Sequence, residues 1–307
     1  MIESFECVNC HTLYEPIECT GLCSCGGLVL PAASERSISI KELLHNTANL
    51  WRYKEYFLRE STVEWKEITM GEGFTPLISL DRDNPSILLK LEFLSPLSGA
   101  HDRGYAVLAV LLKHLGIEES GINPKTEQER HSWKTYMHRA KLKGIPETGV
   151  RIDTEPYYHP FFLAGIQTYA YEIWEQLSGE KLEFIVFPTD NPSIIIGAFL
   201  GFKHLLDSKN IEEYPAFLLV EKEDSRIAHQ PDSVKDQIMK IVDLTKGKKI
   251  IIAQAEIVQA KKALRARAIK SNEDDALLYA GFMRYYRDHS IKDQLAVLPI
   301  GLMNGGV

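Results

Sequence analysis

The chain lacks the features that mark secreted, membrane-spanning or nucleic-acid-binding proteins. Residues 1–8 contain no basic segment followed by an apolar one, so we expect no secretory signal peptide there. The longest apolar stretch, at residues 194–200, is far too short to cross a bilayer. The net charge is −7 and there is no long basic run, which argues against a phosphate-backbone partner. We therefore expect a soluble, cytoplasmic protein that binds neither membrane nor nucleic acid.

Cysteine is missing from most of the chain, because all five cysteines stand within the first 25 residues. In a cytosolic protein such a cluster favours metal binding over disulfides. Two short ligand turns, Cys-Val-Asn-Cys and Cys-Ser-Cys-Gly-Gly, can present four thiolates to one ion. Zinc suits four thiolates in a tetrahedron, and a closed site of this kind is structural rather than catalytic.

We accordingly predict that residues 1–31 form a zinc-binding knuckle. Cys19 is left as a spare ligand, although it could replace Cys23 because the second pair is spaced as CxC. Reduced cysteines without a metal are the alternative interpretation. The predicted ligands are Cys7, Cys10, Cys23 and Cys25.

The remaining chain has ordinary globular composition, with 45% hydrophobic and 25% charged residues among 307. Apolar strands alternate with amphipathic helices, which indicates an α/β fold with a mostly parallel sheet. The expected strands are 87–93, 184–188, 216–220, 249–253 and 295–300, and the expected helices are 38–60, 105–115, 126–143, 161–177, 194–206 and 274–288.

Several phrases, in order along residues 5–205, resemble those of the threonine synthases, which are fold-type-II pyridoxal-phosphate (PLP) enzymes. The cysteine knuckle ends in Cys-Gly-Gly-Leu, as it does in many members of that family. The other matching phrases are Leu50-Trp51-Arg52-Tyr53, Gly71-Glu72-Gly73-Phe74-Thr75-Pro76-Leu77, Lys90-Leu91-Glu92-Phe93, Gly99-Ala100-His101-Asp102-Arg103-Gly104 and His159-Pro160 with the helix that follows.

This resemblance implies a tryptophan-synthase-β-like parallel-sheet core over residues 32–307. It also implies a mobile small domain. Only 57 residues separate His101 from His159, so we expect that domain to be shortened and to lie around residues 80–155.

The resemblance fails where the family holds its cofactor, so we expect PLP to be absent. His101 stands where the family has its Schiff-base lysine, and imidazole cannot form the exchangeable imine of a primary amine. The family's glycine-rich phosphate turn reads Asp190-Asn191-Pro192-Ser193 here, where proline removes one N–H donor. The family's Ser-Gly-Asn-Thr-Gly loop has no counterpart. The residues expected to line the former cleft are Thr75, Asp102, Arg103, Asp190, Asn191 and Ser193.

Three functional hypotheses follow from the resemblance. The first is a pseudoenzyme that uses the old cleft for a small-molecule ligand, or its surface for a protein partner. Such a chain would dimerise with itself or with an active family member. The second is a PLP-independent enzyme, for example in a biosynthetic pathway, with His101 as its acid/base group. The third is PLP chemistry on a displaced lysine.

Three smaller expectations concern side chains near these phrases. Asp190 or Asn191 is expected to cap the helix that follows the turn. Tyr157, Tyr158 and His159 could line the former cleft, although packing against it is favoured. A solvated helix face is favoured over a metal site for Glu129, His131 and His138.

Overall fold

The computed structural model describes most of the chain. The described residues are 5–16, 21–31, 37–39, 43, 47–57, 64–97, 99–117, 124, 126–142, 156–223, 231–289, 291 and 293–302.

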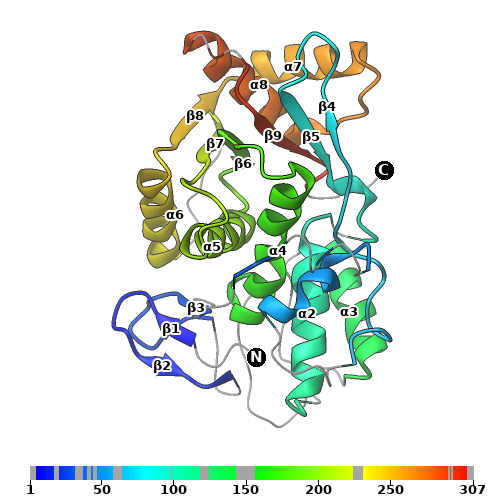
Figure 1. The fold of residues 1–307 in the computed structure, drawn as a ribbon, viewed down its shortest axis with the longest axis vertical. Coiled ribbons are helices and arrows are strands. Elements are labelled where there is room, and N and C mark those ends of the chain that lie inside the picture. The colour runs from blue at the N-terminus through cyan, green and yellow to red at the C-terminus, as the bar shows by residue number, and fades with distance from the viewer. Residues whose placement is uncertain are drawn as a thin grey trace.

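A six-stranded sheet forms the centre of the molecule (Figure 1). Five strands run parallel, and the edge strand β4 is antiparallel to β5. The strand β6 has the predicted bounds because Phe-Ile-Val-Phe-Pro is apolar throughout and is buried on both faces. In spatial order the strands are β4 (Leu77–Ser79), β5 (Ile87–Leu91), β9 (Ala296–Ile300), β6 (Phe184–Pro188), β7 (Ala216–Lys222) and β8 (Lys248–Ile252).

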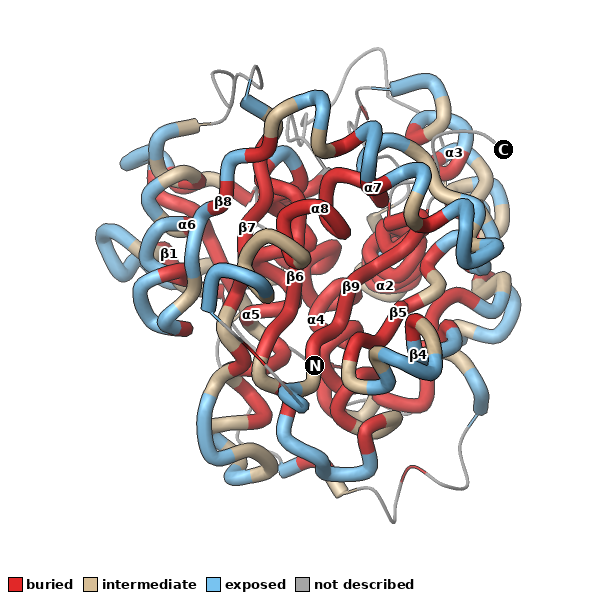
Figure 2. Tube along the Cα trace, turned by 90° about the horizontal axis from the view of Figure 1, so that it is seen from above, coloured by how far each residue is buried: buried red, intermediate tan, exposed pale blue. Residues whose placement is uncertain are grey.

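Helices cover both faces of this sheet, and alternate residues of each strand divide between two cores. Ile185 and Phe187 of β6 join the core that includes α2, α4, α5 and α6, whereas Val186 joins the core of α7 and α8. Figure 2 shows the central strands β9, β6 and β7 buried between these layers. The helices are α2 (His101–His114), α3 (Glu127–Ala140), α4 (Pro160–Gln176), α5 (Pro192–Asp207), α6 (Asp232–Leu244), α7 (Gln254–Ala266) and α8 (Glu273–Asp288).

The cysteine-rich N-terminus forms a separate three-stranded antiparallel sheet. Its ring Phe5 lies against Phe161 at the start of α4, with centroids 5.3 Å apart. In Figure 1 this small sheet lies beside α4, where β3 makes its contacts. The strands are β1 (Phe5–Cys7), β2 (Leu13–Tyr14) and β3 (Val29–Pro31).

The single long helix expected at 38–60 is only partly correct in its described residues. Leu43 is helical, but further on the chain forms a 3₁₀ helix, η2 (Leu50–Tyr56), whose N-cap Asn49 accepts a hydrogen bond from the Trp51 N–H. Residues on all sides of η2 are buried, and the Arg52 guanidinium donates to the carbonyls of Leu43 and Thr47. These tertiary contacts favour a tight, short turn over a surface helix.

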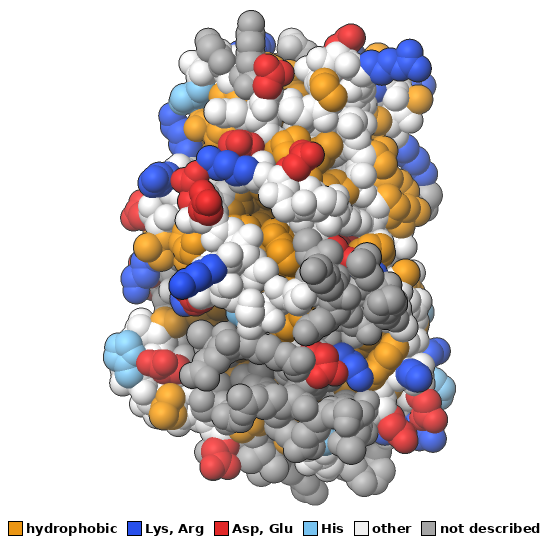
Figure 3. All heavy atoms as spheres, viewed as in Figure 1, with side chains coloured by type: hydrophobic (Ala, Val, Ile, Leu, Met, Phe, Trp, Pro, Cys, Tyr) orange, Lys and Arg blue, Asp and Glu red, His pale blue; other side chains and the backbone are white. Residues whose placement is uncertain are grey.

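The predicted fold class is confirmed as α/β with a mostly parallel sheet. The other expected strands and helices are present with small shifts of their ends, and α6 and α7 were not predicted. The divisions at residue 31 and around residues 80–155 stay predictions. Among the described residues, no helix has the length and apolarity required to span a membrane. On the face in Figure 3, basic and acidic side chains are interspersed.

Candidate functional site

The strand order of the sheet reverses between β6 and β9, which makes the carboxyl ends of these two strands a topological switch point. From β6 the chain moves outward to β7 and β8, then returns through α7 and α8 to β9 on the other side of β6. Ligand sites of open α/β sheets form where the strand order reverses in this way. Three turns meet at this point, at residues 99–101, 191–193 and 301–302.

Gly99 sets the position of His101 in the first of these turns. Its φ is +63°, and a Cβ there would lie 2.4 Å from the Leu302 carbonyl oxygen. The next residue, Ala100, donates its N–H to the same carbonyl at 3.2 Å. This close approach requires glycine and fixes His101 as the first residue of α2.

His101 is buried and joined to the turn before α5. Its Nε2 lies 3.1 Å from Asn191 Oδ1 and 3.2 Å from Ser193 Oγ. The Ser193 hydroxyl in turn donates to Asn191 Oδ1 at 3.2 Å. Burial lowers the pKa of His101 to about 4, although Glu129 and the bond to Asn191 act in the opposite direction. The imidazole is therefore neutral at pH 7, and with Oδ1 as acceptor its proton is on Nε2.

Asn191 occupies the expected N-cap position but does not cap the helix with its side chain. Asn191 is the N-cap residue of α5, yet its side chain makes no cap hydrogen bond. The reason is that Oδ1 is directed to His101 and Ser193 instead. Pro192 follows as the first helical residue, so that position has no N–H to offer an anion.

Aromatic side chains enclose the imidazole on its other sides. The Tyr157 ring lies 5.0 Å from it at an interplanar angle of 32°, and the Phe162 ring lies at 5.6 Å. The Tyr157 hydroxyl is 3.3 Å from that of Tyr105. Burial would raise the pKa of Glu129, but hydrogen bonds from Tyr157 and Thr126 lower it below its usual range.

Sequence reasoning placed Glu129 wrongly on a solvated face. Glu129 is buried and forms a capping box with Thr126 at the start of α3, while His131 and His138 are exposed as expected. The capping-box spacing Thr-x-x-Glu was the available signal. Tyr157 packs against His101, in agreement with the favoured expectation.

The other residues assigned to the former cleft lie in different places. Asp102 accepts the Leu97 N–H at 2.7 Å and so holds the preceding loop. Asp190 lines a separate cavity of about 260 Å³ at the ends of β6 and β7. Thr75 and Arg103 belong to a buried ion-pair network. Of the predicted set, the structure brings together His101, Asn191 and Ser193.

The ion-pair network centres on Arg103. Its guanidinium contacts Glu92 at 2.5 Å and Glu172 at 2.8 Å, and Lys90 contacts Glu172 at 2.7 Å, all four side chains having 0% exposure. Burial alone would lower the pKa of Arg103, but the charges of Glu172 and Glu92 raise it well above its usual range. Each charge is thus compensated inside the core, and the network has a structural role.

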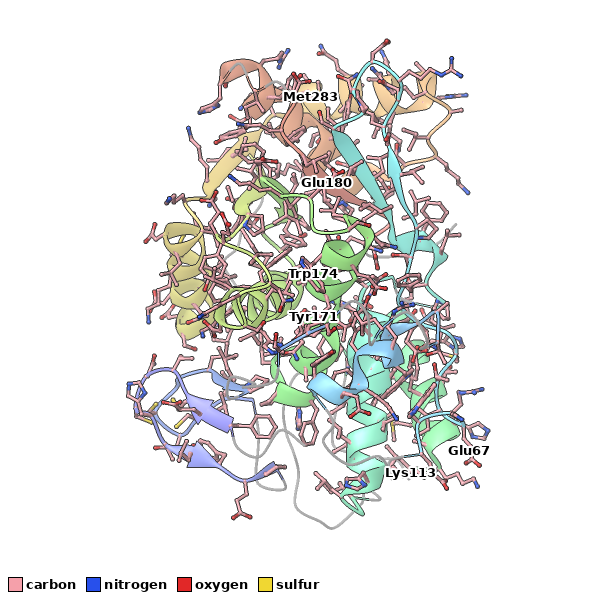
Figure 4. The ribbon with its side chains drawn as sticks, in the orientation of Figure 1. Glu67, Lys113, Tyr171, Trp174, Glu180 and Met283 are labelled. Atoms are coloured by element: carbon pink, nitrogen blue, oxygen red, sulfur yellow. The ribbon has the colours of Figure 1, made fainter. Side chains whose placement is uncertain are left out.

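Of the two lysines that flank His101 in the sequence, Lys90 is held in the ion-pair network and Lys113 lies far from His101 along α2. Lys90 donates to Glu172, and also to the Thr75 carbonyl, and burial lowers its pKa. Lys113 lies near the far end of α2, beside Glu67 at 3.8 Å (Figure 4).

The four predicted zinc ligands form a compact cluster. Their Sγ atoms all lie within 4.8 Å of one another, and the Cys7–Cys25 and Cys10–Cys23 distances are 3.5 Å. The Tyr14 hydroxyl donates to Cys23 Sγ at 2.9 Å and lowers the pKa of that thiol to about 6. The arrangement is compatible with one tetrahedral metal ion. The spare ligand, Cys19, lies outside the described residues.

Comparison with known proteins agrees with this geometry. No protein-family model matches the chain. Threonine synthase of Methanocaldococcus jannaschii is 25% identical over an aligned length of 257, and the match covers 68% of this chain and 63% of that enzyme. The match thus covers a little under two-thirds of the relative's own length.

Solved structures show the same fold at lower identity. Threonine synthase from Escherichia coli has a TM-score of 0.67 at 12% identity and covers 96% of this chain and 87% of its own. Serine racemase from Dictyostelium discoideum has a TM-score of 0.57 at 14% identity, with coverages of 89% and 99%. The fold is that of the fold-type-II PLP enzymes. Within that class, the chain is similar in sequence to threonine synthase.

The residues at the site do not fit a PLP Schiff base. His101 has no primary amine, and its Nε2 is bonded to Asn191 and Ser193. The turn that would face the phosphate contains Pro192, and the carboxylate of Asp190 precedes it.

Proposed function

We propose that this chain is a threonine-synthase-like protein that has lost PLP binding. It retains a structural zinc site at Cys7, Cys10, Cys23 and Cys25, and uses the former active-site region or its surface to bind a small ligand or a protein partner. Pairing with itself or with an active family member belongs to the same proposal.

One observation carries this proposal. The residue at the Schiff-base position is an imidazole that is 3% exposed, hydrogen-bonded to Asn191 and Ser193, and covered by the Tyr157 ring. A buried, neutral ring with its Nε2 already bonded supports a packing role, whereas PLP chemistry requires a free amine.

The test is to incubate the protein with PLP, reduce with borohydride and map any pyridoxyl-lysine by mass spectrometry. We expect no stoichiometric adduct in the wild type. We also expect none in His101→Lys, because Pro192 and Asp190 remain in the turn. Full modification of one wild-type lysine together with turnover of O-phosphohomoserine would overturn the proposal.

A second candidate function is favoured by the contact between Ser193 Oγ and His101 Nε2 at 3.2 Å. A hydroxyl beside a neutral imidazole is the arrangement of a nucleophile and its base. For this role the proton would lie on Nδ1 instead of Nε2, so that Nε2 accepts the Ser193 proton and His101 is the acid/base group of a PLP-independent enzyme. Turnover of any screened substrate that is lost in both Ser193→Ala and His101→Gln would favour this candidate over a binding role.

A further inference from the structure

The cysteine knuckle packs directly against the segment that covers His101. We refer to residues 156–159, which comprise η4 (Pro156–Tyr158) and the N-cap of α4, as the Tyr157 segment. Gly21 of the knuckle has φ +64°, and a Cβ there would lie 2.7 Å from the Tyr158 carbonyl oxygen. The two backbones are therefore in close contact, and Phe5 against Phe161 extends the same interface to α4.

Gly21 belongs to the same hairpin as the predicted metal ligands. Its carbonyl accepts the Val29 N–H at 2.8 Å, and two residues later Cys23 donates its N–H to the Gly27 carbonyl at 2.8 Å. Leu22 pairs with Leu28 between these two bonds. The position of Gly21 is thus fixed by the turn that presents Cys23 and Cys25.

On its other side, the Tyr157 segment contacts the candidate site. The Tyr157 ring lies 5.0 Å from the His101 ring and 5.6 Å from the Phe162 ring. Tyr157 and Tyr158 are both buried, in one continuous core with Phe5, Cys7 and Cys23. A displacement of Tyr158 would therefore move the ring that covers the imidazole.

The knuckle depends on its metal for this shape. Four sulfur atoms within 4.8 Å of one another repel as thiolates unless a cation lies between them. The described strands of the knuckle have only two or three residues each, so metal binding supplies much of the free energy that folds it.

We propose that the knuckle is a metal-dependent clamp on the candidate site. Bound zinc holds Gly21 against the Tyr158 carbonyl and thereby holds Tyr157 over His101, and loss of the metal frees Tyr157 and exposes the imidazole. This inference rests on the proposed zinc site but not on the proposed loss of PLP, which the borohydride experiment tests separately.

The experiment is hydrogen–deuterium exchange with mass spectrometry on the zinc-loaded protein, before and after removal of zinc by a chelator. We expect exchange in the peptide covering residues 156–163 to rise at least tenfold after zinc removal. Exchange in α8, which belongs to the other core, should not change. Unchanged exchange at 156–163 while the knuckle itself opens would overturn the clamp, and so would a protein that contains no zinc.

A pair of glycine variants tests the contact without removing the metal. Gly21→Ala places a Cβ against Tyr158, whereas Gly26→Ala carries similar backbone strain, at φ +83°, with no atom within 4 Å of the added Cβ. With zinc content confirmed for both proteins, only Gly21→Ala should raise exchange at residues 156–163. Equal effects of the two variants, or no effect of Gly21→Ala, would contradict the proposal.

Discussion

The knuckle and the His101 site differ in what their polar side-chain atoms contact. In the knuckle, four thiols converge within 4.8 Å and two of them are exposed, so the groups face one another across a space that suits an ion. At the His101 site, the imidazole Nε2, the amide and the hydroxyl bond to one another and are nearly sealed from solvent, while Nδ1 is buried with no hydrogen-bond partner among the described residues. Four thiols that converge on one space indicate an ion, whereas polar groups that bond mainly to one another indicate packing.

The largest expected effect is on the knuckle. The double variant Cys7→Ser, Cys10→Ser should lose zinc and reduce the free energy of unfolding by more than about 5 kcal/mol, because metal binding free energy becomes folding free energy. Metal analysis and denaturant titration measure both quantities. The neighbouring exposed variant Ser24→Ala is the matched control and should keep one zinc per chain. If the double variant has the stability of the wild type, the knuckle does not depend on a metal ion, and the contrast with the His101 site is lost.

The next largest effect concerns the buried ion-pair network centred on Arg103. Glu172→Gln should lower the free energy of unfolding by about 3–5 kcal/mol, since it leaves the charges of Arg103 and Lys90 undercompensated in the core. Chemical denaturation measures the loss. Glu273→Gln, which removes a partly exposed pair with Lys222, is the control and should cost less than about 1 kcal/mol. Similar losses for the two variants would argue against the structural role of the network.

The third effect is a pH dependence of stability at His101. The pKa of His101 is about 4 in the folded protein, below the ordinary value of 6.5. Between pH 4 and pH 6.5, His101 is therefore protonated in the unfolded chain but not in the native protein. The free energy of unfolding should therefore fall as pH decreases from 6.5 to 4, by up to about 3 kcal/mol in total from this residue. His101→Gln should remove this part of the slope in denaturation curves recorded across that range. A variant with the wild-type slope would mean that His101 is accessible to protons in the native protein.

The smallest effect is on the hydrogen bond at Cys23. Tyr14→Phe removes the donor to its sulfur and should weaken zinc binding about tenfold, with the four ligands unchanged. Competition with a chromophoric chelator measures the affinity, and Tyr286→Phe on α8 is the control. Equal affinities in wild type and Tyr14→Phe would show that the thiolates need no support from this hydroxyl.

The sequence predicted these two regions unequally for a physical reason. The knuckle is local, since its ligands are spaced by two or three residues within two turns, and spacing alone predicted their convergence. The partners of Arg103 are 11 and 69 residues away, so its place in the core network could not be read from the motif that contains it. Likewise, Asn191 was correctly placed at a helix start, but the direction of its side chain depends on His101, 90 residues earlier.

The core strands were predictable because burial on both faces requires continuous apolar residues, as in residues 184–188. The expectation of one helix over 38–60 was wrong at residues 50–56, because its apolar spacing there is shared by a 3₁₀ helix that tertiary contacts stabilise. The prediction that Glu129 lies on a solvated helix face was wrong. The sequence pattern around it is typical of a surface helix, but its hydrogen bonds to Thr126 and Tyr157 allow the carboxylate to be buried.

The order of strands also constrains how the chain folds during synthesis. β9 lies between β5 and β6 and bonds to both, yet its residues, 296–300, are made more than a hundred residues after β6. Until then β5 and the β6–β7–β8 group have no common partner, and each presents an unpaired edge. We expect the nascent chain to depend on chaperones during that interval, and removal of β9 to leave two unpaired, aggregation-prone sheet edges.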